Sequence, residues 1–410
     1  MAPPAAAGCE AVELYRGRVD RTRRLLPPHL AGLGTTVFAQ MSALAVATGS
    51  VNLGQGYPDT DGPVEVAQAA ARAVLEGRGN QYPPGTGIPE LRRAVAEHQR
   101  WRYGIGLDPD TDVLVTAGAT EAIAAAMLAL VDIGDEVVAL EPYYDSYAAT
   151  IAMARGVRVP VTLRPPLFAL DADALRCAVT QRTRVLLLNS PHNPTGAVLS
   201  RPELEAVAEV AVAHDLLVVA DEVYEHLVFD GAEHIPIATL PGMAERTVTI
   251  GSAGKTFSFT GWKVGWVTGP ADLVAAVRTT KQFLTYVSAG PFQYAIAEAL
   301  RAEPGAYEGP RLQMQAQRDL LCEGLADLGL EVFRPRGTYF VTTDVRPLGW
   351  SDGMQFCREL PERCGVVAIP HQVFYDDVEA GRPLVRWAFC KRPDVLREAL
   401  SRLRSGRLAR

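Results

Sequence analysis

Short apolar runs recur through the middle of the chain and alternate with stretches of helical periodicity. Seven such runs lie between residues 113 and 268, and helical spacing fills most of the intervals between them. Strands that alternate with helices indicate a mostly parallel sheet covered by helices on both faces. The last two runs lie too close together for a helical crossover, so we expect one antiparallel strand among the parallel ones. The runs are residues 113–116, 136–140, 157–161, 185–188, 216–220, 247–250 and 264–268.

The pattern changes in the last third of the chain. Two helical stretches, 291–303 and 306–328, precede several short strand-like runs and a final helix. This order predicts a smaller α+β domain that the N-terminal segment completes. The predicted fold class is therefore α/β, with a large domain in residues 53–298, a mostly parallel sheet sandwiched by helices, and a smaller α+β domain built from 1–52 and 299–410.

Polar residues follow five of the apolar runs within a few positions. Because ligands bind at the carboxyl ends of the strands in open α/β sheets, we expect these residues to meet at one edge of the sheet. In chain order, the runs are followed by Gly118-Ala119-Thr120, by Tyr143, by Asn193, by Asp221 with Tyr224, and by Ser252 with Lys255.

Lys255 stands in a stretch of small and aromatic residues, IGSAGKTFSFTGWKVGWVTG. Burial and the nearby cation Lys263 lower the pKa of a lysine amine, which makes Lys255 a candidate Schiff-base nucleophile. A solvated loop lysine is the plain alternative. A nucleotide-binding loop of the pattern G-x-x-x-x-G-K-[ST] would need glycine at position 249, where the chain has Thr249.

The other candidate residues complete a chemical set. The helix start at Gly118-Ala119-Thr120 can bind an anion, although it can also be an ordinary helix cap. Tyr143 can stack on a flat ring, or it can be an ordinary surface or core aromatic residue. Asp221 ends an apolar run and needs a cationic partner, either a protonated ring nitrogen or a structural ion pair. A phosphate cradle, a stacking ring, a buried carboxylate and an amine together describe a pyridoxal phosphate site.

Composition narrows the class of protein further. The chain has 410 residues, 48% of them hydrophobic, and a net charge of −7, which argues against nucleic acid as a partner despite the basic run 21–24. Its six cysteines are scattered without a C-x-x-C pair, so we expect reduced thiols in a cytoplasmic protein. Histidine spacing shows no metal motif, so no metal is expected. Neither a signal peptide nor a membrane span is expected.

Several stretches between Asn52 and Lys391 resemble the class I/II aminotransferases of pyridoxal-phosphate fold type I. The similarity is strongest to the branch that contains kynurenine/glutamine transaminases and succinyldiaminopimelate aminotransferases. The stretches are NLGQGYPD, YPPGTGIPELRRAVAEH, VTAGATEAI, GDEVVALEPYYDSY, NSPHNPTGAV, VVADEVYEHLVFDG, GSAGKTFSFTGWKVGW and VRWAFCK.

The resemblance implies roles around the cofactor ring. Lys255 would form the Schiff base with pyridoxal phosphate and carry the proton to and from the substrate α-carbon. Asp221 would pair with the pyridinium nitrogen, while Asn193 and Tyr224 would bind the ring hydroxyl oxygen. Tyr143 would stack on the ring.

The resemblance also implies a phosphate site and a substrate site. Tyr82 would reach the phosphate from a second subunit, so the enzyme would be a homodimer. Arg386 would bind the substrate α-carboxylate, and Gly56 would let that carboxylate approach the backbone. Within one chain, the phosphate would be held by Ala119, Thr120, Ser252 and Lys263.

We therefore expect a transaminase that moves an amino group from an L-amino acid to a 2-oxo acid. Neutral donors such as glutamine, methionine or aromatic amino acids are favoured, because Arg386 is engaged by the α-carboxylate and no second cation is evident in the pocket. An inward-turned Arg336 would instead admit the acidic donor of a succinyldiaminopimelate aminotransferase. A lyase or an oxidase on the same scaffold is a further alternative, since those reactions use the same residue set.

Overall fold

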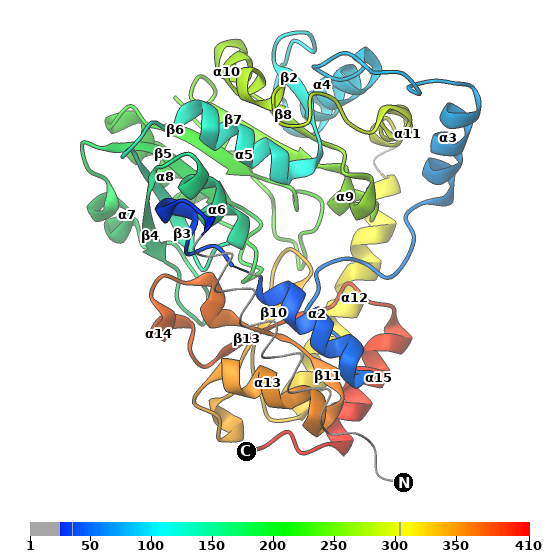
Figure 1. Ribbon diagram of the computed structural model, residues 1–410, viewed down its shortest axis with the longest axis vertical. Helices are drawn as coiled ribbons and strands as arrows, with labels where there is room; N and C mark the ends of the chain where they lie inside the picture. Colours follow the sequence, from blue (N-terminus) through cyan, green and yellow to red (C-terminus); the bar gives the residue numbers. More distant parts are fainter. Residues whose placement is uncertain (1–24, 35, 303–304) are drawn as a thin grey trace.

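The computed structural model describes residues 25–34, 36–302 and 305–410; the basic run 21–24 and Cys9 lie outside this part. A seven-stranded sheet in the order β2-β8-β7-β6-β5-β3-β4 forms the upper part of the molecule (Figure 1). Strand β8 runs antiparallel to both of its neighbours, β2 and β7, and the other neighbouring pairs of the sheet are parallel. The strands are β2 (Val113–Thr116), β3 (Glu136–Glu141), β4 (Val157–Thr162), β5 (Thr183–Asn189), β6 (Leu217–Asp221), β7 (Thr247–Ser252) and β8 (Gly265–Thr268).

Helices cover both faces of this sheet because side chains alternate along each strand. In β3, Val137 packs in the same buried cluster as Ile123 of α5, whereas Val138 packs in the opposite cluster with Leu204 of α8. Both faces of the strands are thus apolar, as expected of a doubly covered sheet. The flanking helices are α5 (Gly118–Leu130), α6 (Asp145–Met153) and α10 (Ala271–Lys281) on the first face, and α7 (Ala172–Ala178) and α8 (Arg201–Ala213) on the second.

A third buried cluster closes the β2 end of the sheet. There, Leu91 of α4 and Ile296 of α11 pack in one cluster with Val115 of β2 and Trp266 of β8. The short helix α9 (Ala253–Thr256) follows β7 in this region. The helices of the cluster are α3 (Val64–Leu75), α4 (Pro89–Tyr103) and α11 (Gly290–Leu300).

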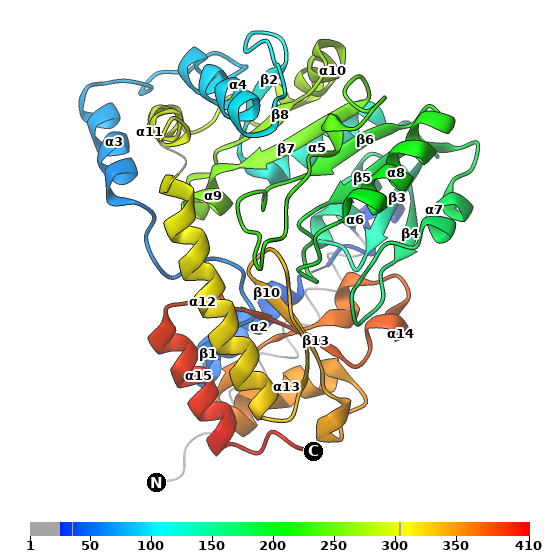
Figure 2. The same ribbon diagram turned by 180° about the vertical axis from the view of Figure 1, so that it is seen from behind.

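Two smaller sheets lie in the lower part of the molecule. One is antiparallel in the order β12-β13-β10-β9, and the other is the parallel pair β1–β11, in which Val51 lies opposite Val366. Figure 2 shows α12 running from the upper part to the lower part. The elements are β1 (Val51–Asn52), β9 (Glu331–Phe333), β10 (Phe340–Asp344), β11 (Val366–Val367), β12 (Ile369–Pro370), β13 (Leu384–Ala388), α2 (Val37–Thr48), α12 (Gly305–Asp327), α13 (Gly353–Cys364), α14 (Val378–Gly381) and α15 (Pro393–Ser405).

The predicted architecture is confirmed. Each of the seven apolar runs forms a strand of the large sheet, and one of the last two, β8, is antiparallel as expected. The sequence pattern did not reveal α7, α10 or α13, which are 7, 11 and 12 residues long. No helix among the described residues has the length and apolar character needed to cross a membrane.

Candidate active site

A cavity of about 390 Å³ lies at the carboxyl edge of the large sheet. Residues that follow β2, β3, β5, β6 and β7 line it, together with Phe340 of β10 and Arg386 of β13. All but two of the predicted site residues meet here: Gly56, Ala119, Thr120, Asn193, Asp221, Tyr224, Ser252, Lys255, Lys263 and Arg386. The sequence therefore predicted most of one site from segments that are far apart in the chain.

Lys255 enters the cavity from α9, one turn after the end of β7. Its Nζ donates a hydrogen bond to the hydroxyl of Tyr339 at 2.7 Å. Burial lowers the pKa of the amine to about 8, and the charge of Lys263 acts in the same direction while that of Asp221 opposes it. A larger fraction of this amine is therefore neutral and nucleophilic near neutral pH than of an exposed lysine.

Asp221 ends β6 with its carboxylate buried in the cavity wall. Burial raises the pKa of this carboxyl to about 6, although hydrogen bonds from Tyr147 and from the backbone N–H of Val223 stabilise the charged form. A carboxylate held in this way would be stabilised further by a cationic group within the cavity. Tyr147 was not predicted from the sequence; it lies in α6, on the helix face toward β6.

The start of α5 has the features of an anion-binding cradle. Gly118 has φ of +71°, a conformation that suits glycine, and it begins the helix with its backbone N–H groups unpaired by the helix itself. The Nζ of Lys263 lies 3.4 Å from the hydroxyl oxygen of Thr120 and 3.2 Å from where a Cβ on Gly118 would lie. A helix N-terminus, a hydroxyl and an ammonium directed at one place suit a phosphate group.

Arg386 lies in β13 and is only 2% exposed. Its Nη atoms donate to Oδ1 of Asn193 and to the carbonyl of Gly54, each at 3.0 Å, and its Nε has no partner. Among the described residues, no carboxylate forms an ion pair with it. Burial lowers the pKa of the guanidinium to about 10, and the ring of Phe340 stacks 3.9 Å from it. This unneutralised cation at the cavity wall is suited to a carboxylate ligand.

Tyr143, predicted to stack on the cofactor ring, does not line this cavity. Its hydroxyl donates to Asp376 at 2.8 Å, and the guanidinium of Arg158 lies 5.1 Å from its ring. The adjacent residue, Tyr144, lines the cavity instead, and burial raises the pKa of its hydroxyl to about 12. The chain turns between β3 and α6 here, so a shift of one position reverses the direction of the side chain.

Tyr82 also lies outside the cavity. It is 83% exposed, and its ring meets the edge of Tyr286, which is itself 50% exposed, at a centroid distance of 5.7 Å. Within one chain it therefore contacts none of the phosphate-cradle residues that the structure describes. The predicted role of Tyr82 requires a second copy of the chain.

The remaining walls are aromatic, and the cavity continues outward. Phe38, Tyr57 and Phe340 line it beside Gly56, where a Cβ would lie 2.3 Å from the ring of Phe340. An adjoining cavity of about 800 Å³ shares Phe38, Tyr144 and Asp145 with it. Arg336 lines neither of these two cavities, so the second cation that we considered for an acidic donor does not come from this residue.

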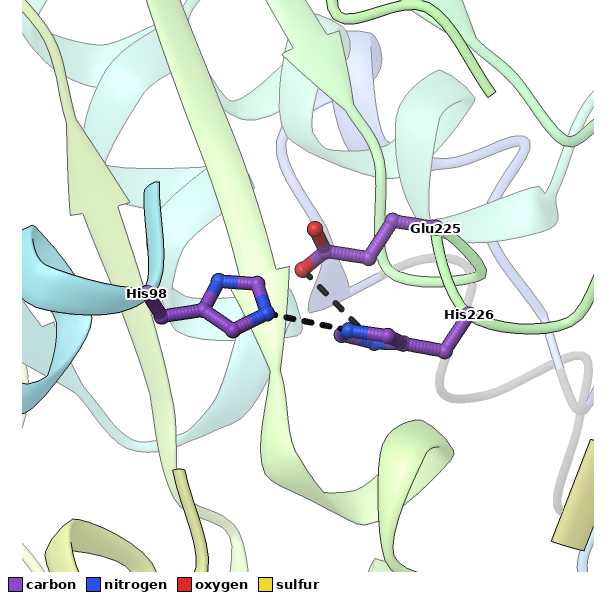
Figure 3. A group of neighbouring side chains, drawn as sticks. All are labelled: His98, Glu225 and His226. Carbon is purple, nitrogen blue, oxygen red and sulfur yellow. Dashed lines mark hydrogen bonds and ion pairs between the residues drawn. The ribbon is translucent and has the colours of Figure 1, made fainter. Parts of the chain in front are cut away.

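Figure 3 shows a buried polar group made of His98, Glu225 and His226. The Nε2 atoms of His98 and His226 are 3.0 Å apart, and Oε1 of Glu225 lies 4.0 Å from Nδ1 of His226. Nδ1 of His226 also lies 3.2 Å from the hydroxyl of Thr256, the residue after Lys255. Such side chains can ligate a metal, but the two imidazoles already bond each other, and burial lowers the pKa of both. The expected absence of a metal stays a prediction.

Comparison with known proteins places the chain in a family. The model of the family described as aminotransferase class I and II matches residues 48–403. The structure of N-succinyldiaminopimelate aminotransferase from Mycobacterium tuberculosis is similar, with a TM-score of 0.91 and 56% identity, covering 92% of this chain and 99% of that one.

Two further relatives are more distant. Methionine aminotransferase of Escherichia coli is 41% identical over 375 residues, 92% of this chain and 97% of the relative. Human kynurenine–oxoglutarate transaminase 1 is 38% identical over 383 residues, 86% of this chain and 91% of the relative. The predicted resemblance is thus confirmed, and the chain belongs to the class I and II aminotransferases, transaminases of fold type I that use pyridoxal 5'-phosphate.

Proposed function

We propose that this transaminase holds pyridoxal phosphate in the cavity at Lys255 and exchanges the amino group of an L-amino acid there. The juxtaposition of the low-pKa amine of Lys255, the buried carboxylate of Asp221 and the anion cradle at Thr120 supports this proposal. The bound cofactor supplies an aldehyde for the amino group and a ring that withdraws electrons.

We assign the individual contacts as follows. Asp221 pairs with the ring nitrogen, and Asn193 and Tyr224 bind the ring hydroxyl oxygen. Tyr144 stacks on the ring in place of Tyr143, because Tyr144 lines the cavity. The phosphate is held by Ala119, Thr120, Ser252 and Lys263, with Tyr82 of a second copy.

Arg386 binds the α-carboxylate of the substrate. It is a buried cation whose Nε has no partner, and the flat guanidinium can bind both carboxylate oxygens. Position 56 requires glycine, because the ring of Phe340 leaves no room for a Cβ there. Binding of the α-carboxylate at this point brings the α-carbon next to the amine of Lys255, which can then remove and return the proton.

The side-chain site suits donors with an apolar stem. Phe38, Tyr57 and Phe340 surround the inner cavity, and no cation lines it except Lys255, Lys263 and Arg386, among the residues that the structure describes. Methionine, glutamine and aromatic amino acids would bury their side chains there. An unpaired carboxylate one carbon from the α-carbon, as in aspartate, would be costly.

The larger outer cavity favours a long donor of the N-succinyldiaminopimelate type. Such a donor would place its methylene stem among the inner aromatic side chains and its succinylated end in the adjoining 800 Å³ space. The 56% identical relative named for this substrate supports the same assignment. We therefore propose N-succinyldiaminopimelate as the main donor and neutral amino acids as secondary donors.

Single-turnover absorbance measurements on the enzyme loaded with pyridoxal phosphate test these assignments. The loaded enzyme is mixed with one donor at a time, and the loss of the visible absorbance band of the Lys255 Schiff base is followed. The donors are N-succinyldiaminopimelate, methionine, glutamine, phenylalanine and aspartate. We expect the first donor to react fastest and aspartate slowest. The variant Lys255→Ala is the control, and its transamination should fall by several powers of ten. Fast conversion by aspartate alone would contradict the donor assignment.

We also propose that two copies of the chain assemble as a homodimer. Three large apolar side chains near the Tyr82 loop are exposed: Phe283 is 82% exposed, Leu284 45% and Tyr286 50%. A second copy that covers this surface would bury it and bring Tyr82 to the neighbouring phosphate cradle.

Two further assignments concern the organisation of the chain and its location. We propose the division into a large domain, 53–298, and a small domain, 1–52 with 299–410. In support, β1 pairs with β11, and β8 is the last strand of the large sheet along the chain.

We propose a cytoplasmic location and a role in amino acid biosynthesis. The free thiols of the described cysteines support the location, and the N-succinyldiaminopimelate relative supports the role.

A further inference from the structure

The hydroxyl of Tyr339 links the side chain of Lys255 to the backbone of Gly56. It accepts a hydrogen bond from Nζ of Lys255 at 2.7 Å and donates one to the carbonyl of Gly56 at 2.6 Å. We propose that Tyr339 is a positioning residue that holds the Lys255 amine in a fixed orientation beside the substrate carboxylate site. This inference rests on the proposed function of Lys255.

The orientation follows from the single proton of the hydroxyl. Because Tyr339 donates that proton to Gly56, its oxygen presents only lone pairs to Lys255. The amine must therefore point one of its N–H bonds at Tyr339. In the neutral amine, the lone pair consequently points away from Tyr339 and into the remainder of the cavity, where a reacting carbon has to lie.

The hydroxyl is held firmly in place. Tyr339 is 1% exposed, and its ring meets those of Tyr224 and Phe340 edge-on at centroid distances of 5.2 and 4.8 Å. Its carbonyl accepts from the N–H of Phe389 at 3.0 Å. The preceding residue, Thr338, has φ of +65°, an uncommon conformation for a β-branched residue. These ring contacts and the backbone hydrogen bond hold the chain at 338–339 in one conformation, and this fixes the position of the hydroxyl.

The variant Tyr339→Phe removes the hydroxyl and keeps the ring. The ammonium form of Lys255 then loses its hydrogen-bond acceptor, so the pKa of the amine should fall further. We expect the pH midpoint for capture of pyridoxal phosphate by the apoenzyme, followed by visible absorbance, to move down by about one unit. We expect kcat to fall roughly 10- to 100-fold with KM changed less than about 3-fold, because orientation of the amine affects the chemical step.

A purely structural role for Tyr339 would give a different result. If the hydroxyl only held Gly56 in place, its loss would raise KM for donors and leave both kcat and the capture midpoint unchanged. That result would overturn the proposal. A second variant, Tyr339→Leu, removes the hydroxyl together with the ring and must move the capture midpoint in the same direction.

The control is Tyr307→Phe. Tyr307 is also buried and donates its hydroxyl to a backbone carbonyl, that of Leu300, at 3.1 Å, but the Lys255 amine donates its hydrogen bond to Tyr339 and not to Tyr307. This variant should retain the wild-type capture midpoint and kcat. Wild-type protein that captured no cofactor would refute the proposed function itself, whereas normal wild-type capture with an unmoved midpoint in both Tyr339 variants would refute only the role of Tyr339.

Discussion

The hydroxyl of Tyr147 donates a hydrogen bond of 2.5 Å to Oδ2 of Asp221 and thereby joins α6 to the end of β6. Both side chains are buried, and both residues line the candidate active-site cavity. It stabilises the charged form of a carboxyl whose pKa burial nevertheless raises to about 6. The charge state of Asp221 in the cofactor-free protein is therefore sensitive to pH in a range that can be measured.

Cofactor-free protein should lose stability through Asp221 as the pH rises. The folded state binds the proton of this carboxyl more tightly than the unfolded chain does, since its folded pKa of about 6 exceeds the ordinary value of 3.8. Its contribution is therefore complete below about pH 4 and lost as the pH rises through about 6. Relative to Asp221→Asn, the free energy of unfolding of the wild type should fall by up to about 3 kcal/mol between about pH 4 and pH 8.

Chemical denaturation of both apoproteins across this pH range measures the difference. In Tyr147→Phe, the charged carboxylate loses a hydrogen-bond donor, so the transition should move to higher pH. Identical pH dependence in the wild type and in Asp221→Asn would contradict the assigned burial of this charge.

Tyr144 and Tyr143 form a matched pair of adjacent residues. Tyr144→Ala should weaken binding of pyridoxal phosphate by roughly 3- to 10-fold, the loss expected for one aromatic stacking contact. Tyr143→Ala should lower the melting temperature, because it leaves a void beside Asp376, but should change cofactor affinity less. Equilibrium dialysis and thermal melts of the two variants distinguish these outcomes, and the reverse order of affinities would restore the original assignment of Tyr143.

Arg386→Leu should separate activity from stability. Removal of the guanidinium eliminates a buried charge that has no ion-pair partner among the described residues, so the melting temperature should stay the same or rise. The α-carboxylate would lose its two hydrogen bonds, and kcat/KM should fall more than about 100-fold for every donor. A variant that loses activity only for acidic donors would show that Arg386 binds the side chain instead.

Subunit mixing tests the shared site. Tyr82→Ala and Lys255→Ala should each have low activity, but a mixed dimer contains one site with an intact Lys255 and an intact Tyr82 from the other chain. After unfolding and refolding together, the mixture should regain up to about a quarter of wild-type activity, because half of the dimers are mixed and each has one complete site. Sedimentation of the wild type should show a dimer. No recovery on mixing, or an active monomer, would contradict this arrangement.

The sequence by itself determined the sheet, the lysine segment and most of the cavity residues. Apolar runs that are buried on both faces leave a strong local pattern, and polar residues at the carboxyl ends of parallel strands gather for topological reasons alone. Lys255, Asp221 and Asn193 could be predicted because each comes within five positions after the end of such a run. Strand order alone brings the three residues to the same edge of the sheet.

Only the tertiary structure decided which side chains enter the cavity from irregular segments. Tyr143 is drawn away by Asp376, a residue 233 positions later, and this leaves Tyr144 in the cavity. Tyr339 contacts Lys255, and Phe340 contacts Arg386 because β10 pairs with the strand that carries this arginine. Local sequence periodicity does not predict such contacts, because they depend on how the small antiparallel sheet packs against the carboxyl edge of the large one.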